Sequence, residues 1–369
     1  MKTLILGGYG AVGIETARIL LDKTELEVIL AGRSRQKAEA AASELAEESC
    51  NPRVSGIAID ASNFTEIVNE FKKVDWVIIC IPLSGIGSKI AEAAFEANVN
   101  YIDINANHQK QVYLQQKAED IRKKELTFVT EAGCVPGIPS LLVFHAFSKL
   151  GQLKSVEVGS MAREAKITYG SVYDMLVELG VSHRIYKDQN WIKAKLSDGR
   201  KIDLGPPFGT MNCYPFEFYE LLTLPMEKLG IQNLGLYAPG VNPAIDSLFF
   251  IYMMTGLYKS KTALHLGARF ATWAEKFTKP PFATLVQVNA LAHNNNRILV
   301  RVSHSDAYQA TAIPLAACII QMLEMDLISQ YGMHLMGHFL DSDEFLRKIA
   351  QLGMDVIVED GIESITAVA

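Results

Sequence analysis

The sequence predicts an α/β protein of two domains: a doubly wound parallel sheet, then a second α/β domain with a mixed or antiparallel sheet. Three observations support this class. The 369 residues exceed one ordinary core, because domains hold roughly 100–200 residues. Apolar runs and helix-like segments alternate through the first 135 residues, and this alternation stops after Gly137, where hairpin signals begin. We therefore predict domains at 1–135 and 136–304, with residues 305–369 as a C-terminal segment.

Six apolar, β-rich runs predict the strands of the first domain. They are Thr3–Leu6, Glu27–Ala31, Val54–Ile59, Trp76–Ile81, Tyr101–Ile104 and Leu126–Thr130. The helix-like segments between them are Ile14–Leu21, Gln36–Glu47, Phe64–Lys72, Ser88–Ala97 and Gln109–Lys124. Strands that are apolar on both faces and alternate with helices indicate a parallel sheet covered on both sides, as in Rossmann domains. Such sheets bind ligands beyond the carboxyl ends of their strands.

The second domain is predicted from turn signals and from period-two patterns. A helix at Ser140–Leu150 leads to a strand at Ser155–Met161. Two hairpins are expected: Trp191–Leu196 with Arg200–Leu204 around Asp198-Gly199, and Thr284–His293 with Ile298–Ser303 around three asparagines. An apolar helix at 307–326 is expected to return to the first domain. A final helix, capped by Asp341 or Ser342, ends near Leu352 before a strand at Asp355–Glu359.

Composition narrows the classes of partner and compartment. The net charge is −6 with no Lys/Arg block, which argues against nucleic-acid binding. Five scattered cysteines and no visible signal peptide favour the cytoplasm. The apolar run Leu248–Tyr258 is shorter than the roughly 20 residues of a membrane span. We expect a buried helix or a homodimer contact there, with a monotopic membrane contact as the alternative. His334 and His338 lack a third ligand, so no metal site is expected.

A glycine-rich turn follows the first predicted strand and opens a helix. Gly8, Gly10 and Gly13 form a GxGxxG pattern that encloses Tyr9, Ala11 and Val12. Gly8 would permit the tight turn, Gly10 the approach of a pyrophosphate, and Gly13 close helix–strand packing. This context predicts a dinucleotide site.

The end of the second strand indicates which dinucleotide is bound. Arg33 and Ser34 stand where an NAD site carries an acidic residue that binds the ribose 2′-hydroxyl. A guanidinium suits a 2′-phosphate, which favours NADP and leaves NAD open. Asp60, at the end of the third strand, is expected either near the adenine or as a helix cap.

The nicotinamide is expected over the ends of the later strands. The residues predicted to contact it are Ile81, Pro82, Ala132 and Gly133. The candidate site groups at these ends are Asp103, Asn105, Glu131 and Cys134. Asp103 is the preferred group for proton transfer, with Cys134 second. Arg163, with Lys166 near it, is the preferred cation for substrate carboxylates.

Several stretches resemble the saccharopine dehydrogenase-like family, which includes saccharopine reductase and carboxynorspermidine dehydrogenase. They are GGYGAVG at 7–13, AGRS at 31–34, YIDI at 101–104, EAGCVPGIPSLL at 131–142 and TAIPLA at 311–316. The sequence departs from the family pattern at Val135, where an acidic residue is usual, and at 332–337, which lacks Pro and Glu. The resemblance implies the fold, a nicotinamide cofactor and reductive chemistry.

The hypothesis that follows is an NAD(P)-dependent oxidoreductase. It would transfer hydride to or from a C=N bond of a small, amino-acid-like substrate that carries carboxylates. The alternative is a non-catalytic NADP-binding sensor or scaffold, with an apolar partner surface near Phe249–Leu257.

Overall fold

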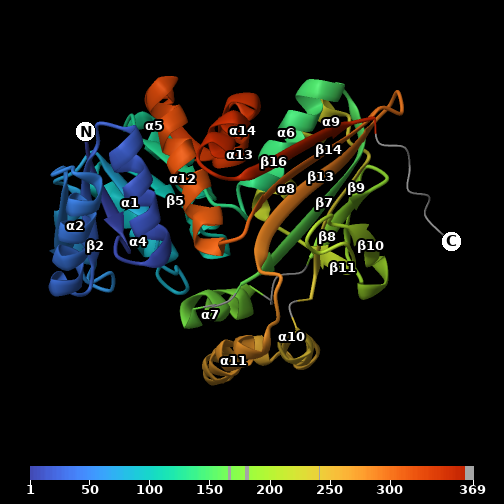
Figure 1. Ribbon diagram of the computed structural model, residues 1–369, viewed down its shortest axis with the longest axis horizontal. Coiled ribbons are helices and arrows are strands. Elements are labelled where there is room, and N and C mark those ends of the chain that lie inside the picture. Colours follow the sequence, from blue (N-terminus) through green and yellow to red (C-terminus); the bar gives the residue numbers. More distant parts are fainter. Residues whose placement is uncertain (165–167, 179–182, 241, 362–369) are drawn as a thin grey trace.

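The structure is a computed structural model that describes residues 1–164, 168–178, 183–240 and 242–361. Two sheets lie side by side with helices around them (Figure 1). The first sheet is entirely parallel and the second is mixed, so the predicted fold class is confirmed.

The first sheet has seven strands in the order β15-β6-β5-β4-β1-β2-β3. Their bounds are β1 (Lys2–Leu6), β2 (Glu27–Gly32), β3 (Val54–Ala58), β4 (Trp76–Ile79), β5 (Asn100–Asp103), β6 (Thr127–Thr130) and β15 (Gly332–Leu335). The strand order reverses between β1 and β4, which is where doubly wound sheets open a ligand crevice. The sequence did not indicate β15. This strand comes from the segment at 332–337 and pairs with β6 in parallel.

Helices cover both faces of this sheet. They are α1 (Ala11–Lys23), α2 (Arg35–Ser49), α3 (Phe64–Phe71), α4 (Gly87–Ala97) and α5 (His108–Lys123). Polar residues cap the N-termini of α2, α3 and α5. The side chains of Ser34, Asn63 and Asn107 each accept a hydrogen bond from a backbone N–H of the first turn. From the far end of the sequence, α12 (Ala307–Glu324) packs against α1.

The second sheet runs β10-β11-β12-β7-β13-β14-β16, and the pair β8–β9 joins it at β12. Its strands are β7 (Leu153–Arg163), β8 (Arg184–Lys187), β9 (Asn190–Lys193), β10 (Arg200–Asp203), β11 (Thr210–Phe216), β12 (Asn233–Pro239), β13 (Ala283–Ala292), β14 (Arg297–His304) and β16 (Asp355–Asp360). The helices of this half are α6 (Ile138–Leu150), α8 (Tyr219–Leu222), α9 (Met226–Leu229), α13 (Met336–Phe339) and α14 (Ser342–Gln351).

One predicted hairpin is confirmed and the other is wrong. The antiparallel pair β13–β14 forms as expected. Around Asp198-Gly199, however, the flanking strands do not pair with each other: β9 pairs with β8, and β10 pairs with β11. The true turn is Asp188-Gln189, where both residues have positive φ (48° and 65°), as tight two-residue hairpins require. Gly199 has φ −60°, so its conformational freedom is not used for a hairpin.

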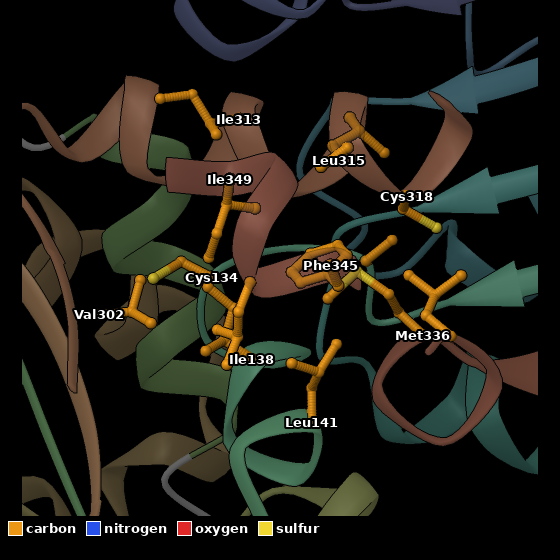
Figure 2. Packing of buried hydrophobic residues seen from close by; sticks show 14 of the residues in the cluster. Cys134, Ile138, Leu141, Val302, Ile313, Leu315, Cys318, Met336, Phe345 and Ile349 are labelled. Carbon is orange, nitrogen blue, oxygen red and sulfur yellow. The ribbon is translucent and has the colours of Figure 1, made fainter. Parts of the chain in front are cut away.

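A continuous apolar core joins the two halves. Figure 2 shows Cys134 and Ile138, from the segment that leaves the first sheet, packed near Val302 of β14 and Phe345 of α14. Leu315 of α12 belongs to the same buried cluster (Figure 2). Because these side chains are buried together, the two sheets are held in a fixed relation on either side of the crevice.

A helical unit lies beyond the end of the second sheet (Figure 1). It consists of α7 (Tyr169–Glu178), α10 (Pro243–Thr255) and α11 (Lys261–Ala274), with a small core of its own. Short 3-10 turns follow at Leu257–Lys259 and Glu275–Phe277, and others lie at Leu196–Asp198 and Leu327–Ser329. Among the described residues, no helix is long and apolar enough to cross a membrane.

Candidate active site

A cleft of about 2900 Å³ separates the two sheets and is lined by residues of both. Its floor is formed by the carboxyl ends of the parallel strands, at Gly7 after β1, Cys80 after β4 and Glu131 after β6. The opposite wall comes from the second sheet and from α7 and α10. The cleft therefore lies where a doubly wound sheet binds its ligand.

The glycine turn fits a dinucleotide, with one correction to the predicted roles. Gly7, not Gly8, makes the tight turn: its φ is +90°, and a Cβ there would lie 2.8 Å from the Cys80 carbonyl oxygen. Gly8 is required for packing, since its Cβ would lie 2.7 Å from Leu30 Cα. At Gly13 a Cβ would lie 2.3 Å from the Gly7 oxygen, so helix and turn approach closely. Gly10 precedes α1 directly and lines the cleft.

The first turn of α1 is a ready anion site. Tyr9, Gly10, Ala11 and Val12 line the cleft where α1 begins, and the free N–H groups of a helix start attract phosphate. No carboxylate occurs in this first turn, so nothing on the helix itself opposes an anion.

Just after β2, Arg33 is exposed and lines the cleft. Ser34 does not line it. The Ser34 hydroxyl caps α2 by accepting from Lys37 N at 3.3 Å, and its backbone N–H donates to the Tyr9 hydroxyl at 3.1 Å. Asp60 lines the cleft and accepts from both N and Oγ of Ser62. These hydrogen bonds, and then the charge of Arg33, lower the pKa of Asp60.

Beyond the ends of β4, β5 and β6, the cleft has a polar floor. Ile81, Pro82, Asn105 and Glu131 line it, and Asn105 Nδ2 donates to the Ile81 carbonyl at 3.2 Å. Three further polar residues of this region also line it: Asn107, His108 and Gln111. Ala132 and Gly133 are buried and do not line the cleft, so a direct contact with a cofactor is not supported for them.

Asp103 does not reach the cleft, contrary to its predicted role. Its side chain is 0% exposed and pairs with the equally buried Lys110, with Nζ 2.6 Å from Oδ1. Thr130 Oγ1 donates to its other oxygen at 2.9 Å, and Asn105 N donates to Oδ1 at 2.8 Å. With every oxygen engaged below the floor, Asp103 supports the strand ends, and we do not carry it forward as a proton donor.

Cys134 and Arg163 are also displaced from the cleft. Cys134 lies in the apolar core of Figure 2, where burial raises the pKa of its thiol to about 12. Ser160 and Ala162 on β7 line the cleft, as does Glu164 just after it, and strand alternation turns Arg163 to the other face. Its guanidinium lies 5.3 Å from the Phe208 ring centroid. Lys166 lies outside the described residues.

Glu131 has the properties that were expected of Asp103. It directly follows β6 with φ +56°, a left-handed conformation that is uncommon for a residue with a side chain, and it lines the cleft while only 1% exposed. Gln111 Nε2 donates to its Oε1 at 2.8 Å, whereas Oε2 has no hydrogen-bond partner among the described residues. Burial, and then the charge of Glu220, raise the pKa of Glu131 to about 8.

Glu220 is the residue that sequence reasoning missed. It comes from the short helix α8 of the second half and accepts hydrogen bonds from Gly137 N at 2.7 Å and Ser140 N at 3.0 Å, and another from Ser140 Oγ. Burial raises its pKa to about 7. No motif surrounds it in the sequence, so only the tertiary structure brings it to the beginning of α6, near Glu131.

Two histidines considered as metal ligands have other partners. His334 Nε2 donates to the Gln330 carbonyl at 2.7 Å, and His338 Nε2 donates to the Glu220 carbonyl at 2.8 Å. Within the described ranges, no group of three His, Cys, Asp or Glu side chains could hold a metal ion.

Comparison with known proteins identifies the first domain. Residues 3–129 match the family model described as the saccharopine dehydrogenase NADP binding domain. The N-terminal domain is similar to this family over these residues. The matched residues include the glycine turn and Arg33, and similarity to an NADP-binding family implies a nicotinamide cofactor. No curated protein sequence matched the chain.

Solved structures show that the whole chain shares the fold of one such enzyme. Apo saccharopine dehydrogenase (L-Glu forming) from Saccharomyces cerevisiae has a TM-score of 0.67 at 14% identity, covering 98% of this chain and all of that one. A dehydrogenase (MviM) from Clostridium difficile has a TM-score of 0.43 at 7% identity, covering 95% of this chain and 97% of that one. UDP-N-acetylglucosamine 3-dehydrogenase GnnA from Acidithiobacillus ferrooxidans has 0.42 at 13%, covering 95% of each. Of these, the yeast enzyme shares the overall fold of this chain.

Proposed function

We propose that this protein is an NADP-dependent oxidoreductase that transfers hydride to or from a C=N bond of an amino-acid-like substrate. The observation that carries the proposal is Glu131, a buried carboxyl that lines the cleft and has one oxygen without a hydrogen-bond partner among the described residues. The NADP-binding family of residues 3–129 supports the cofactor class. When bound, the nicotinamide supplies or accepts the hydride.

The residues of the crevice fit NADP(H). The beginning of α1, with Tyr9 to Val12, would hold the pyrophosphate, and Arg33 would hold the 2′-phosphate. Arg33 suits this task because it is exposed and lines the cleft. Gly7, Gly8 and Gly13 leave no room for a Cβ, so the turn keeps its shape for a close ligand.

Glu131 would hold the proton that accompanies the hydride. Its raised pKa keeps the carboxyl neutral at pH 7, and a neutral carboxylic acid can donate from Oε2 to a substrate nitrogen. Gln111 fixes the orientation of the carboxyl by donating to Oε1. In the opposite direction of the reaction, the ionised form accepts the proton at the same oxygen.

The cations that replace Arg163 as carboxylate ligands are on the second sheet. Lys193, at the end of β9, and Lys195 are exposed and line the cleft. Arg184 on β8 also lines it but is paired with Glu217 at 2.9 Å. The same wall carries aromatic side chains, namely Trp191, Tyr214, Phe216 and Phe218. This wall suits a substrate that has a carboxylate and an apolar body.

A second candidate function is a nucleotide sensor without catalysis. It is favoured by the displacement of Asp103, Cys134 and Arg163 from the cleft, because three expected chemical groups are then absent from it. Both candidates require the nucleotide, and only the oxidoreductase requires Glu131.

The cofactor is tested by titrating wild type, Arg33→Ala and Arg35→Ala with NADPH and NADH, followed by fluorescence. Arg35 is a matched control, since it is an exposed arginine two residues away that pairs with Glu39. Loss of a charge-assisted contact at Arg33 should weaken NADPH about tenfold or more and leave NADH unchanged. Equal binding of both cofactors by wild type would contradict the preference for NADP.

The reaction is tested by NADPH oxidation against a panel of keto acids with amines. Glu131→Gln should reduce turnover by roughly 10²–10⁴-fold, the usual contribution of a positioned acid, without loss of NADPH affinity. Full turnover by Glu131→Gln would remove the proton role. NADPH binding without turnover of any member, in wild type and variant alike, would support the sensor.

A further inference from the structure

The α10–α11 unit, defined as residues 242–281, has an apolar outer surface. Its exposed large apolar side chains are Phe250, Ile251, Met253, Met254, Leu257, Leu266, Phe270, Trp273 and Phe277. Met254 is 70% exposed and Trp273 is 52% exposed. Single exposed apolar residues are ordinary, but a group this dense within one small unit marks a surface that meets a partner.

On α11 and its 3-10 extension, the exposed residues form one helical stripe. Leu266, Phe270, Trp273 and Phe277 recur at intervals of four, three and four. The Trp273 ring centroid lies 5.7 Å from that of Phe270 and 5.0 Å from that of Phe277. The other apolar stripe, with Leu264, Ala268 and Ala271, is buried in the small core shared with α7. Within the described chain, α11 therefore has two apolar faces and only one is covered.

The exposed charged side chains of the unit are all positive. Its exposed charged residues are Lys259, Lys261, Arg269, Lys276 and Lys279. Of its two carboxylates, Glu275 is buried and Asp246 is partly buried. The whole chain has a net charge of −6, so this cationic surface is a local departure from the composition. It is complementary to an anionic surface.

The two helices are too short to cross a membrane. α10 has 13 residues and α11 has 14, both below the roughly 20 that span a bilayer. Short helices with exposed Trp, Phe and Leu and with nearby lysines lie in the headgroup region instead of crossing it.

We infer that the α10–α11 unit docks the protein on an anionic phospholipid bilayer. The apolar stripe enters the interface and the lysines at both ends of α11 contact the headgroups. A second copy fits less well, because a two-fold contact would place these cations against the same cations. Phe250, Met253 and Met254 also line the cleft, so the docked protein opens its cleft at the lipid surface. The docking does not depend on the proposed reaction.

The test is co-sedimentation of the full chain with vesicles of phosphatidylcholine alone and of phosphatidylcholine with phosphatidylglycerol. Wild type should bind the anionic vesicles, and binding should weaken as salt rises. Phe270→Ser with Trp273→Ser should abolish it, and both side chains are exposed, so the fold should survive. Lys276→Glu with Lys279→Glu should weaken it about 25-fold or more, since each cation is worth about fivefold.

The matched control is Lys72→Glu with Lys123→Glu, which makes the same charge change on exposed lysines of the nucleotide domain. This control should bind vesicles nearly as wild type does, and circular dichroism should show all variants folded. Three results would overturn the inference: no binding of wild type to anionic vesicles, equal binding by all variants, or a dimer without vesicle binding that Phe270→Ser with Trp273→Ser dissociates. The last would assign the surface to a second copy.

Discussion

Lys110 and Asp103 form an ion pair that is 0% exposed on both sides, directly below the cleft floor. Lys110→Met should lower the free energy of unfolding by about 3–5 kcal/mol, because it leaves the Asp103 carboxylate buried without its partner. Urea denaturation measures this loss. Combining Lys110→Met with Asp103→Asn should restore much of it, since no unpaired charge then remains. If Asp103→Asn kept full stability but removed turnover, Asp103 would regain the proton role.

For single residues, the sequence predicts the position along the chain but not the direction of the side chain. The positions of Asp103 and Glu131 at strand ends could be predicted from the βα alternation, since strand ends fix which residues approach the crevice. The direction of each side chain could not. Asp103 points to Lys110 on the next helix, while Glu131 lines the cleft and has one oxygen without a hydrogen-bond partner among the described residues. Glu220 carried no signal, because its partners Gly137 and Ser140 are about 80 residues away in the sequence.

At the scale of the element, β16 protects the edge of the second sheet. It pairs with β14 over Asp355 to Asp360 and places acidic residues on the outer edge, a common guard against strand addition. A chain that ends at Met354 should expose the backbone of β14 and associate, as light scattering would show. The control is a chain that ends at Gly361, which keeps β16 and should scatter as the full chain does. Equal scattering by both truncations would refute the protective role.

The elements differ in how much of them the sequence could predict. Long βα units were predicted well because apolar runs and helix caps such as Asn63 and Asn107 agree locally with the final fold. The hairpin at Asp198-Gly199 was wrong because a local turn signal competes with strand pairing that is decided elsewhere. The strand β15 has only four residues, and pairing with β6 defines it more than its own pattern does.

At the scale of the whole molecule, the two sheets share one core and the cleft lies between them. The cluster includes Leu20 of α1, Val158 of β7 and Leu315 of α12, so helices from both ends of the sequence close it. The resemblance to saccharopine dehydrogenases and the loss of alternation after Gly137 predicted this class of architecture. Sequence could not predict the orientation of the exposed stripe on α11, because both of its faces are apolar.

The free energy of unfolding of the whole molecule should depend on pH through the protonation of Glu131. Its pKa is raised to about 8 in the folded protein from 4.5, so the folded state holds a proton that the unfolded state releases between these values. The stability from the neutral carboxyl is full below pH 4.5 and is lost as pH rises to about 8. The half-buried His183 and His338, whose pKa values are lowered by desolvation, act in the opposite sense, so the difference between wild type and Glu131→Gln is the quantity to compare. Glu131→Gln should nearly match wild type near pH 4.5 and be more stable by about 3 kcal/mol at pH 7. Urea denaturation of both proteins from pH 4.5 to 8 measures this. A constant difference over that range would mean that Glu131 is ionised in the fold, and it would remove the basis for a neutral proton donor at the cleft.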